Sequence, residues 1–161
     1  MHLHKVCTWA KCDEYARVIF KHFAKARAAM KPADFVELLQ LWIWTPAYMQ
    51  ANAADLLQSQ LSATTAAKSG NDSAWMPLAA FEAQCEACIF HDTTSEVNNI
   101  KVPTLLTVGM YDIFTPMRFS EYLHQRIEGS KLKVFSGGGH VHHWEALEEF
   151  NQATTHWLLE N

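Results

Sequence analysis

The chain has 161 residues, of which 49% are hydrophobic and 19% charged, and its formal net charge is −4. This length predicts one domain, and a negative charge without a basic block argues against a nucleic-acid-binding protein. The sequence has no apolar run long enough to cross a membrane, and we expect no N-terminal secretion signal. We therefore expect a cytoplasmic globular protein, with no membrane partner, whose four cysteines are reduced.

The first half of the chain predicts one short strand followed by helices. Residues 3–9 are a weak strand candidate, and Asp13 is a candidate N-cap for the helix that follows. The Thr45–Pro46 pair interrupts the helical pattern, because the residue before a proline avoids the helical conformation. A polar loop is expected at residues 68–73. The spacing of apolar residues predicts helices at 15–30, from 32 up to 45, at 46–67 and at 77–90.

The second half alternates strands and helices. Residues 102–108 form a continuous apolar, β-branched run, which is typical of a buried parallel strand. Residues 132–135 predict a second strand, and helices are expected over 116–127 and 144–159. Short connections between buried strands indicate parallel pairing with right-handed crossovers. The predicted fold class is α/β, with two to three parallel strands.

A carboxylate and a histidine follow the two predicted strands of the second half. Asp112 comes after the first strand, and His140 comes after the second strand and three glycines. Groups beyond the carboxyl ends of parallel strands share one edge of the sheet. An acid at that edge can orient the imidazole and stabilise its protonated form while the histidine acts as a general base. The order of acid before histidine is that of one class of hydrolytic triad.

Three segments resemble the α/β-hydrolase superfamily. Residues 100–116 match the pattern I-x-x-P-T-L-x-x-x-G-x-x-D-x-x-T-P. Residues 138–140, with Glu145 and the pair Phe150–Asn151, resemble the ending G-G-H … E … F-N. Residues 8–13 are similar to the segment that leaves the sixth strand of that fold and enters a helical cap. The nearest members are capped ester, lactone and C–C bond hydrolases, including enol-lactonase-like proteins.

This resemblance implies a partial α/β-hydrolase fold. Residues 1–12 would form the first strand segment, 13–95 a helical cap, and 96–161 the part that carries the triad. Asp112 would be the triad acid and His140 the triad base. The superfamily's nucleophile elbow, G-x-S-x-G, does not occur in this sequence. We therefore expect a truncated hydrolase-like protein that is inactive alone, or alternatively a non-catalytic binding or interaction protein that reuses the cap pocket.

A partial α/β-hydrolase fold lacks part of the sheet, and this affects which partners we expect. A small sheet with an open apolar edge is expected to cover it through a homodimer or a complementing half. Trp44 and Tyr48 are the candidate walls of a pocket for an apolar ester or lactone.

Neither a cofactor nor a metal is expected. A metal set of His140, His142, His143 and Glu145 is disfavoured because side chains so close in one loop seldom converge on one ion. The cysteines of Cys85-Glu86-Ala87-Cys88 fit a helix core better than a metal site. Cys7 is interpreted as a core residue rather than a substitute nucleophile.

Overall fold

The computed structural model describes residues 2–69 and 75–160. The chain divides into two compact units, an α/β unit and a helical unit. The α/β unit comprises Met1–Lys11, Trp42–Thr45 and Asp92–Asn161, and the helical unit comprises Cys12–Leu41 and Pro46–His91. The predicted domain boundaries and the function of the helical unit as a cap stay predictions. Most of the loop predicted at 68–73 lies outside the described residues.

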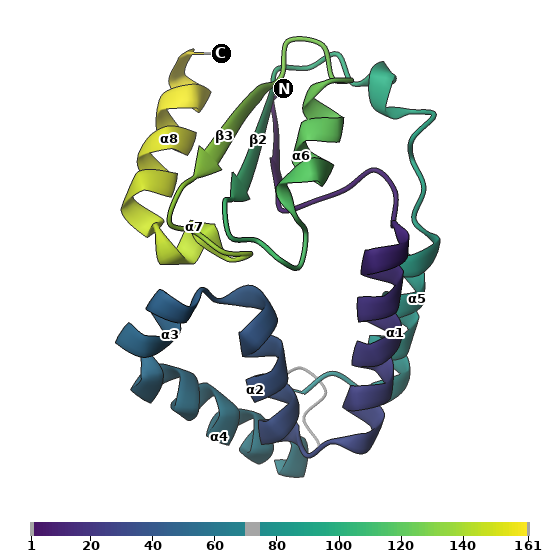
Figure 1. The fold of residues 1–161 in the computed structure, drawn as a ribbon, viewed down its shortest axis with the longest axis vertical. Helices are drawn as coiled ribbons and strands as arrows, with labels where there is room; N and C mark the ends of the chain where they lie inside the picture. The colour runs from purple at the N-terminus through teal and green to yellow at the C-terminus, as the bar shows by residue number, and fades with distance from the viewer. Residues whose placement is uncertain (1, 70–74, 161) are drawn as a thin grey trace. The chain divides into compact units, whose positions relative to one another are not determined.

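A three-stranded parallel sheet forms the centre of the α/β unit and confirms the predicted fold class (Figure 1). The strands are β1 (Leu3–Val6), β2 (Thr104–Gly109) and β3 (Lys131–Phe135), and they lie side by side in this order. β2 is buried along its whole length, as its apolar sequence predicts. Within the described residues, β1 pairs only with β2, so its other edge faces no strand.

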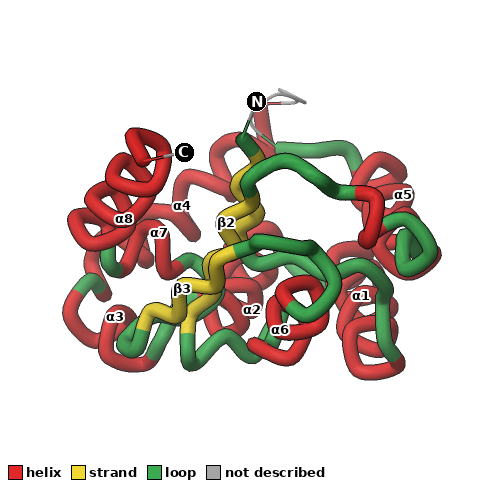
Figure 2. Tube along the Cα trace, turned by 90° about the horizontal axis from the view of Figure 1, so that it is seen from above, coloured by secondary structure: helices red, strands yellow, loops and turns green. Residues whose placement is uncertain are grey.

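Helices cover both faces of this sheet. Figures 1 and 2 show α6 (Met117–His124) on one side and α8 (Leu147–Glu160) on the other. Leu106 points toward the α6 side, where it packs with Leu123. On the α8 side, the Phe135 ring lies 5.9 Å from the ring of Phe150. The alternation of side chains along the strands therefore builds two small cores.

The helix predicted at 144–159 is divided in two. A short helix, α7 (His142–Glu145), precedes α8, and Ala146 separates them. In α8, Trp157 is buried, whereas its neighbour Leu158 is 47% exposed. The early start of α7 places two histidines directly behind the glycine loop. A single 3₁₀ turn, η1 (Val97–Asn99), precedes β2.

The helical unit follows the predicted pattern with one difference. Its helices are α1 (Glu14–Ala29), α2 (Pro32–Ile43), α3 (Pro46–Ala51), α4 (Ala53–Ser69) and α5 (Leu78–Phe90). Asp13 caps α1, because its Oδ1 accepts a hydrogen bond from the Ala16 N–H at 2.8 Å. The predicted helix at 46–67 breaks at Asn52, whose side-chain amide donates to the carbonyl oxygen of Tyr48.

The core of the helical unit is aromatic. Phe35 of α2 makes edge-to-face contacts with Phe23 of α1 and Phe81 of α5, with ring centroids 6.5 and 5.4 Å apart. Such pairs add to the stabilisation from burial alone. Among residues 2–69 and 75–160, no helix combines the length and hydrophobicity that a bilayer crossing requires.

Candidate active site

The carboxyl ends of β2 and β3 bring Asp112 and His140 together. The turn after β2 is hydrogen-bonded to the loop after β3, because the Tyr111 N–H donates to the Gly138 carbonyl oxygen at 2.9 Å. Gly109 sits where this contact is closest. A Cβ at Gly109 would overlap the carbonyl oxygens of Gly138 and Gly139, so a side chain there would push the two loops apart.

Asp112 and His140 form a hydrogen-bonded pair. Asp112 Oδ2 lies 3.0 Å from His140 Nδ1, so the Nδ1–H donates to the carboxylate. The Asp112 side chain is fully buried, and that of His140 is 19% exposed. With Nδ1 bound to the acid, Nε2 is the nitrogen that would take or give a proton. This is the arrangement that a triad acid and base require.

Further hydrogen bonds hold the Asp112 carboxylate. Oδ1 accepts from the backbone N–H groups of Phe114 and Thr115 at 2.9 and 2.7 Å. The Thr115 hydroxyl donates to Oδ2 at 2.7 Å and lies 3.0 Å from His140 Nδ1. Burial by itself raises the pKa of Asp112, but His140 and the Thr115 hydrogen bonds outweigh it and lower the pKa below its usual value. The carboxylate therefore stays ionised at neutral pH.

Glu145 fixes the loop that carries His140. Its Oε1 accepts from the Thr45 N–H at 2.7 Å, and its Oε2 accepts from the Gly139 N–H. On the other side of His140, the Val141 N–H donates to the Ile43 carbonyl oxygen. Val141 is thus bound directly to the segment at 43–45, and Gly139 is linked to it through Glu145. This segment contains Trp44, a residue that the sequence analysis predicts to line a pocket.

Cys7 lies at the site, whereas the sequence analysis favours a core residue over a substitute nucleophile. Its backbone φ is +46°, a left-handed conformation that is uncommon outside glycine. Its thiol donates to the His140 carbonyl oxygen at 2.7 Å, and its Sγ lies 3.3 Å from Nδ1 of His142. Burial, followed by the negative charge of Asp112, raises the pKa of Cys7 well above its ordinary value. A protonated thiol is a poor nucleophile.

His142 is a buried structural histidine. Its ring stacks on Phe135 with centroids 4.7 Å apart. Burial is the main reason why its pKa falls to about 4, so it is neutral at pH 7. In α5, burial raises the pKa of Cys85 to about 11 and leaves it a protonated core residue. Neither group has the properties of an acid–base catalyst at neutral pH.

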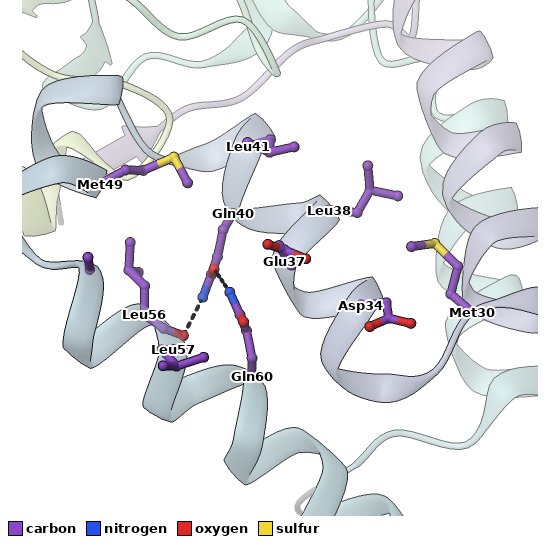
Figure 3. Close-up of a pocket in the computed structure, with 11 residues that line it drawn as sticks. Met30, Asp34, Glu37, Leu38, Gln40, Leu41, Met49, Leu56, Leu57 and Gln60 are labelled. Atoms are coloured by element: carbon purple, nitrogen blue, oxygen red, sulfur yellow. Dashed lines mark hydrogen bonds between the residues drawn. The ribbon is translucent and has the colours of Figure 1, made fainter.

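The helical unit contains a separate cavity of about 460 Å³ between α2 and α4 (Figure 3). Apolar side chains such as Leu38, Leu41 and Leu56 line it. The buried Gln40 also lines the cavity. Its side chain donates to the Leu56 carbonyl oxygen and accepts from the Gln60 side chain. The two predicted pocket residues, Trp44 and Tyr48, are not among its lining residues. Their assignment to a substrate pocket stays a prediction.

Sequence reasoning missed three features of this site. The Asp-x-x-Thr spacing of Asp112 and Thr115 is a local signal, because a carboxylate can accept from N–H groups two and three residues later. The hydrogen bonds of Glu145 to Thr45 and Gly139, which we call the Glu145 clamp, had only a positional signal, because Glu145 follows His140 by five residues. Cys7 had a positional signal, its place directly after the first predicted strand, but its proximity to His140 depends on the pairing of β1 with β2.

Curated relatives match part of the chain. A proline iminopeptidase of Thermoplasma volcanium is 36% identical over 70 residues, which is 44% of this chain and 23% of that protein. A pimeloyl-[acyl-carrier protein] methyl ester esterase of Neisseria meningitidis is 39% identical over 59 residues, 37% of this chain and 23% of that protein. No protein-family model matches the chain.

Solved structures match nearly the whole chain at low sequence identity. The enol-lactonase from Burkholderia xenovorans has a TM-score of 0.79 at 18% identity, covering 98% of this chain and 56% of the enol-lactonase chain. A thermophilic esterase from Thermogutta terrifontis has a TM-score of 0.75 at 19% identity, with 99% and 56% covered. The chain has the fold of the α/β hydrolases, over about half the length of the solved members that it matches.

Proposed function

We propose that this chain supplies the acid and base of a hydrolytic triad for carboxylic esters or lactones, and that the nucleophile comes from residues outside this sequence. The observation that carries the proposal is the buried Asp112 carboxylate, hydrogen-bonded to His140 Nδ1 at 3.0 Å. The similar proteins include an enol-lactonase and esterases, which supports ester or lactone chemistry.

Each residue of the pair has a defined role in this proposal. His140 Nε2 takes the proton of an attacking hydroxyl and later gives it to the leaving group. Asp112 holds the tautomer and stabilises the imidazolium that forms. Thr115 and the N–H of Phe114 keep the carboxylate aligned. Glu145 fixes the loop, so that the ring stays aimed at the substrate.

Hydrolysis of nitrophenyl acetate tests the proposal. The 161-residue chain alone should show no turnover that depends on His140. The longest genomic reading frame that contains this chain, or the chain mixed with a nucleophile-bearing half, should hydrolyse the ester. There, Asp112→Asn should lower kcat by about 10⁴-fold, and His140→Ala should abolish turnover. Because exposed imidazoles cleave this ester slowly, His156→Ala is the matched control, as its side chain is 74% exposed.

Two results would contradict the proposal. Turnover of the longer frame that survives His140→Ala would remove the pair from catalysis. His140-dependent turnover by the chain alone would mean that the nucleophile lies within it, and Cys7→Ala and Ser136→Ala would then identify it.

A second function, non-catalytic ligand binding, is supported by the cavity between α2 and α4. Its volume of about 460 Å³ lies within the range of small-molecule sites. An apolar ester that binds there should lose affinity in Leu41→Asp and keep it in His140→Ala. Calorimetric titration with both variants separates this function from triad chemistry.

A further inference from the structure

We propose that Cys7, Asp112 and His140 form a binding site for a divalent transition-metal ion of the zinc type. One ligand atom from each residue lies within 4.8 Å of the other two. The three residues come from the ends of β1, β2 and β3, so the sheet itself assembles them. This site differs from the His140, His142, His143 and Glu145 set that the sequence raises.

The distances are close to those of a coordination shell. Ligand atoms at about 2.0–2.3 Å from a tetrahedral zinc ion lie roughly 3.3–3.8 Å from each other. Asp112 Oδ2 and His140 Nδ1 are 3.0 Å apart and would separate slightly around the ion. The Cys7 Sγ must approach by at most about 1 Å. Nδ1 of His142 lies 3.3 Å from the Cys7 Sγ and is a candidate for a further ligand.

The donor set selects the metal. One sulfur, one imidazole nitrogen and one carboxylate oxygen suit zinc and its neighbours, whereas calcium and magnesium prefer oxygen ligands alone. Three protein ligands leave a fourth position for water or another side chain. The buried carboxylate supplies the negative charge that a dication requires.

The left-handed backbone of Cys7 is an independent observation. A non-glycine residue pays about 1–2 kcal/mol for this conformation, and such strain concentrates at binding and catalytic sites. The thiol of this left-handed residue donates to the His140 carbonyl oxygen and lies beside the ligand atoms of Asp112 and His140. If the proposed function is correct, metal and substrate chemistry compete, because the ion uses His140 Nδ1 and Asp112.

Cobalt titration of the whole chain tests the site. The reduced, chelator-treated protein is titrated with Co²⁺ while the thiolate-to-cobalt absorption band is followed, and Zn²⁺ affinity is then measured by competition. We expect one ion per chain. Cys7→Ser should abolish the band and weaken Zn²⁺ binding by more than about 100-fold, since even an outer-shell change costs about 10–100-fold. Asp112→Asn should weaken binding without removing the band.

Cys88→Ser is the matched thiol control. Cys85 and Cys88 lie one helical turn apart in α5, so this variant tests whether that pair of thiols, rather than Cys7, gives the band. Its band and affinity should equal those of the wild type. A band that survives Cys7→Ser or vanishes in Cys88→Ser would overturn the proposal, as would no binding at micromolar Zn²⁺. His143→Gln should leave the affinity unchanged, and a large loss in that variant would assign the ion to the histidine-rich loop.

A measurement on the wild type covers the case in which Cys7→Ser does not fold. Zinc should slow maleimide modification of Cys7 and leave Cys12 and Cys85 unaffected. Trypsin cuts after Lys5 and Lys11 and therefore leaves Cys7 and Cys12 in different peptides. Equal modification of Cys7 with and without zinc would refute the site.

Discussion

The Thr115 hydroxyl contacts both members of the acid–base pair. It donates to Asp112 Oδ2 and lies 3.0 Å from His140 Nδ1, and the residue is buried. Removing the hydroxyl takes a hydrogen bond from a buried carboxylate, and bonds to charged groups are worth more than neutral ones. This single group therefore contributes both to stability and to the alignment of the pair.

Thr115→Val is expected to lower the free energy of unfolding by about 1–3 kcal/mol. Thr115→Ser keeps the hydroxyl and should stay closer to the wild type. Urea unfolding at pH 7 measures both variants. Equal stability of the valine and serine variants would show that the hydroxyl bond adds nothing.

His142 should make stability depend on pH. The folded chain holds its pKa at about 4, against about 6.5 in the unfolded chain, mainly through burial and then through His143, while Asp112 acts in the opposite direction. Between these values the unfolded chain binds the extra proton, so stability increases with pH. The stabilisation is complete above about pH 6.5 and is lost as pH falls toward 4, by at most about 3 kcal/mol.

Urea unfolding at pH 7.5, 5 and 4 checks this expectation. His142→Gln removes the titrating ring and should flatten the pH dependence in this range. His156→Gln changes an exposed histidine and should leave the wild-type slope in place. The same slope in His142→Gln as in the wild type would assign the pH dependence to other groups.

Among the elements, the junction of β2 with the loop after β3 determines the geometry of the site. Gly109→Ala places a methyl group against the carbonyl oxygens of Gly138 and Gly139. Because these are backbone atoms, the loop must move, and we expect a loss of at least about 2 kcal/mol. The hydrogen bond between Tyr111 and Gly138 should weaken with it.

Gly137→Ala is the matched control for the same loop. No atom lies within 4 Å of a Cβ built there, so its stability should change by less than about 0.5 kcal/mol. Thermal unfolding followed by circular dichroism compares the two variants. If Gly109→Ala melts at the wild-type temperature, the close approach of the two loops does not constrain the fold.

At the scale of the whole molecule, β1 predicts self-association, because among the described residues no strand pairs with its outer edge. An exposed strand edge is a template for pairing. A two-fold axis beside this edge would pair the β1 strands of two chains and join their sheets. We expect light scattering after size exclusion to give twice the chain mass of 18.3 kDa at micromolar concentration. A stable monomer would contradict the homodimer.

A proline variant tests which surface forms the homodimer. The N–H groups of Leu3 and Cys7 donate toward β2, so by alternation the Val6 N–H faces the other edge. Val6→Pro should therefore give a monomer and leave the pairing with β2 intact. A dimer that persists in this variant would place the contact elsewhere, for example in exchanged helices.

The sequence by itself determined the fold class, most elements and the identity of the pair. Apolar runs, prolines and the Asp13 cap act locally, so the strands and most helices follow from their spacing. The order of Asp112 and His140 after two predicted parallel strands was sufficient to place them at one sheet edge. The break at Asn52 and the separate α7 were missed, because helix spacing continues across both positions.

Only the tertiary structure decided what surrounds the pair. The proximity of Cys7 to the pair depends on the register of β1 against β2. In this register the Cys7 N–H donates to the carbonyl oxygen of Thr107, which lies 100 positions later in the sequence. The Glu145 clamp joins groups about 100 positions apart, Thr45 and the loop at 139. Local patterns carry no information on such contacts, because they arise when the elements pack. For this reason the sequence predicts an acid–base pair, whereas the structure adds the thiol and with it the proposed metal site.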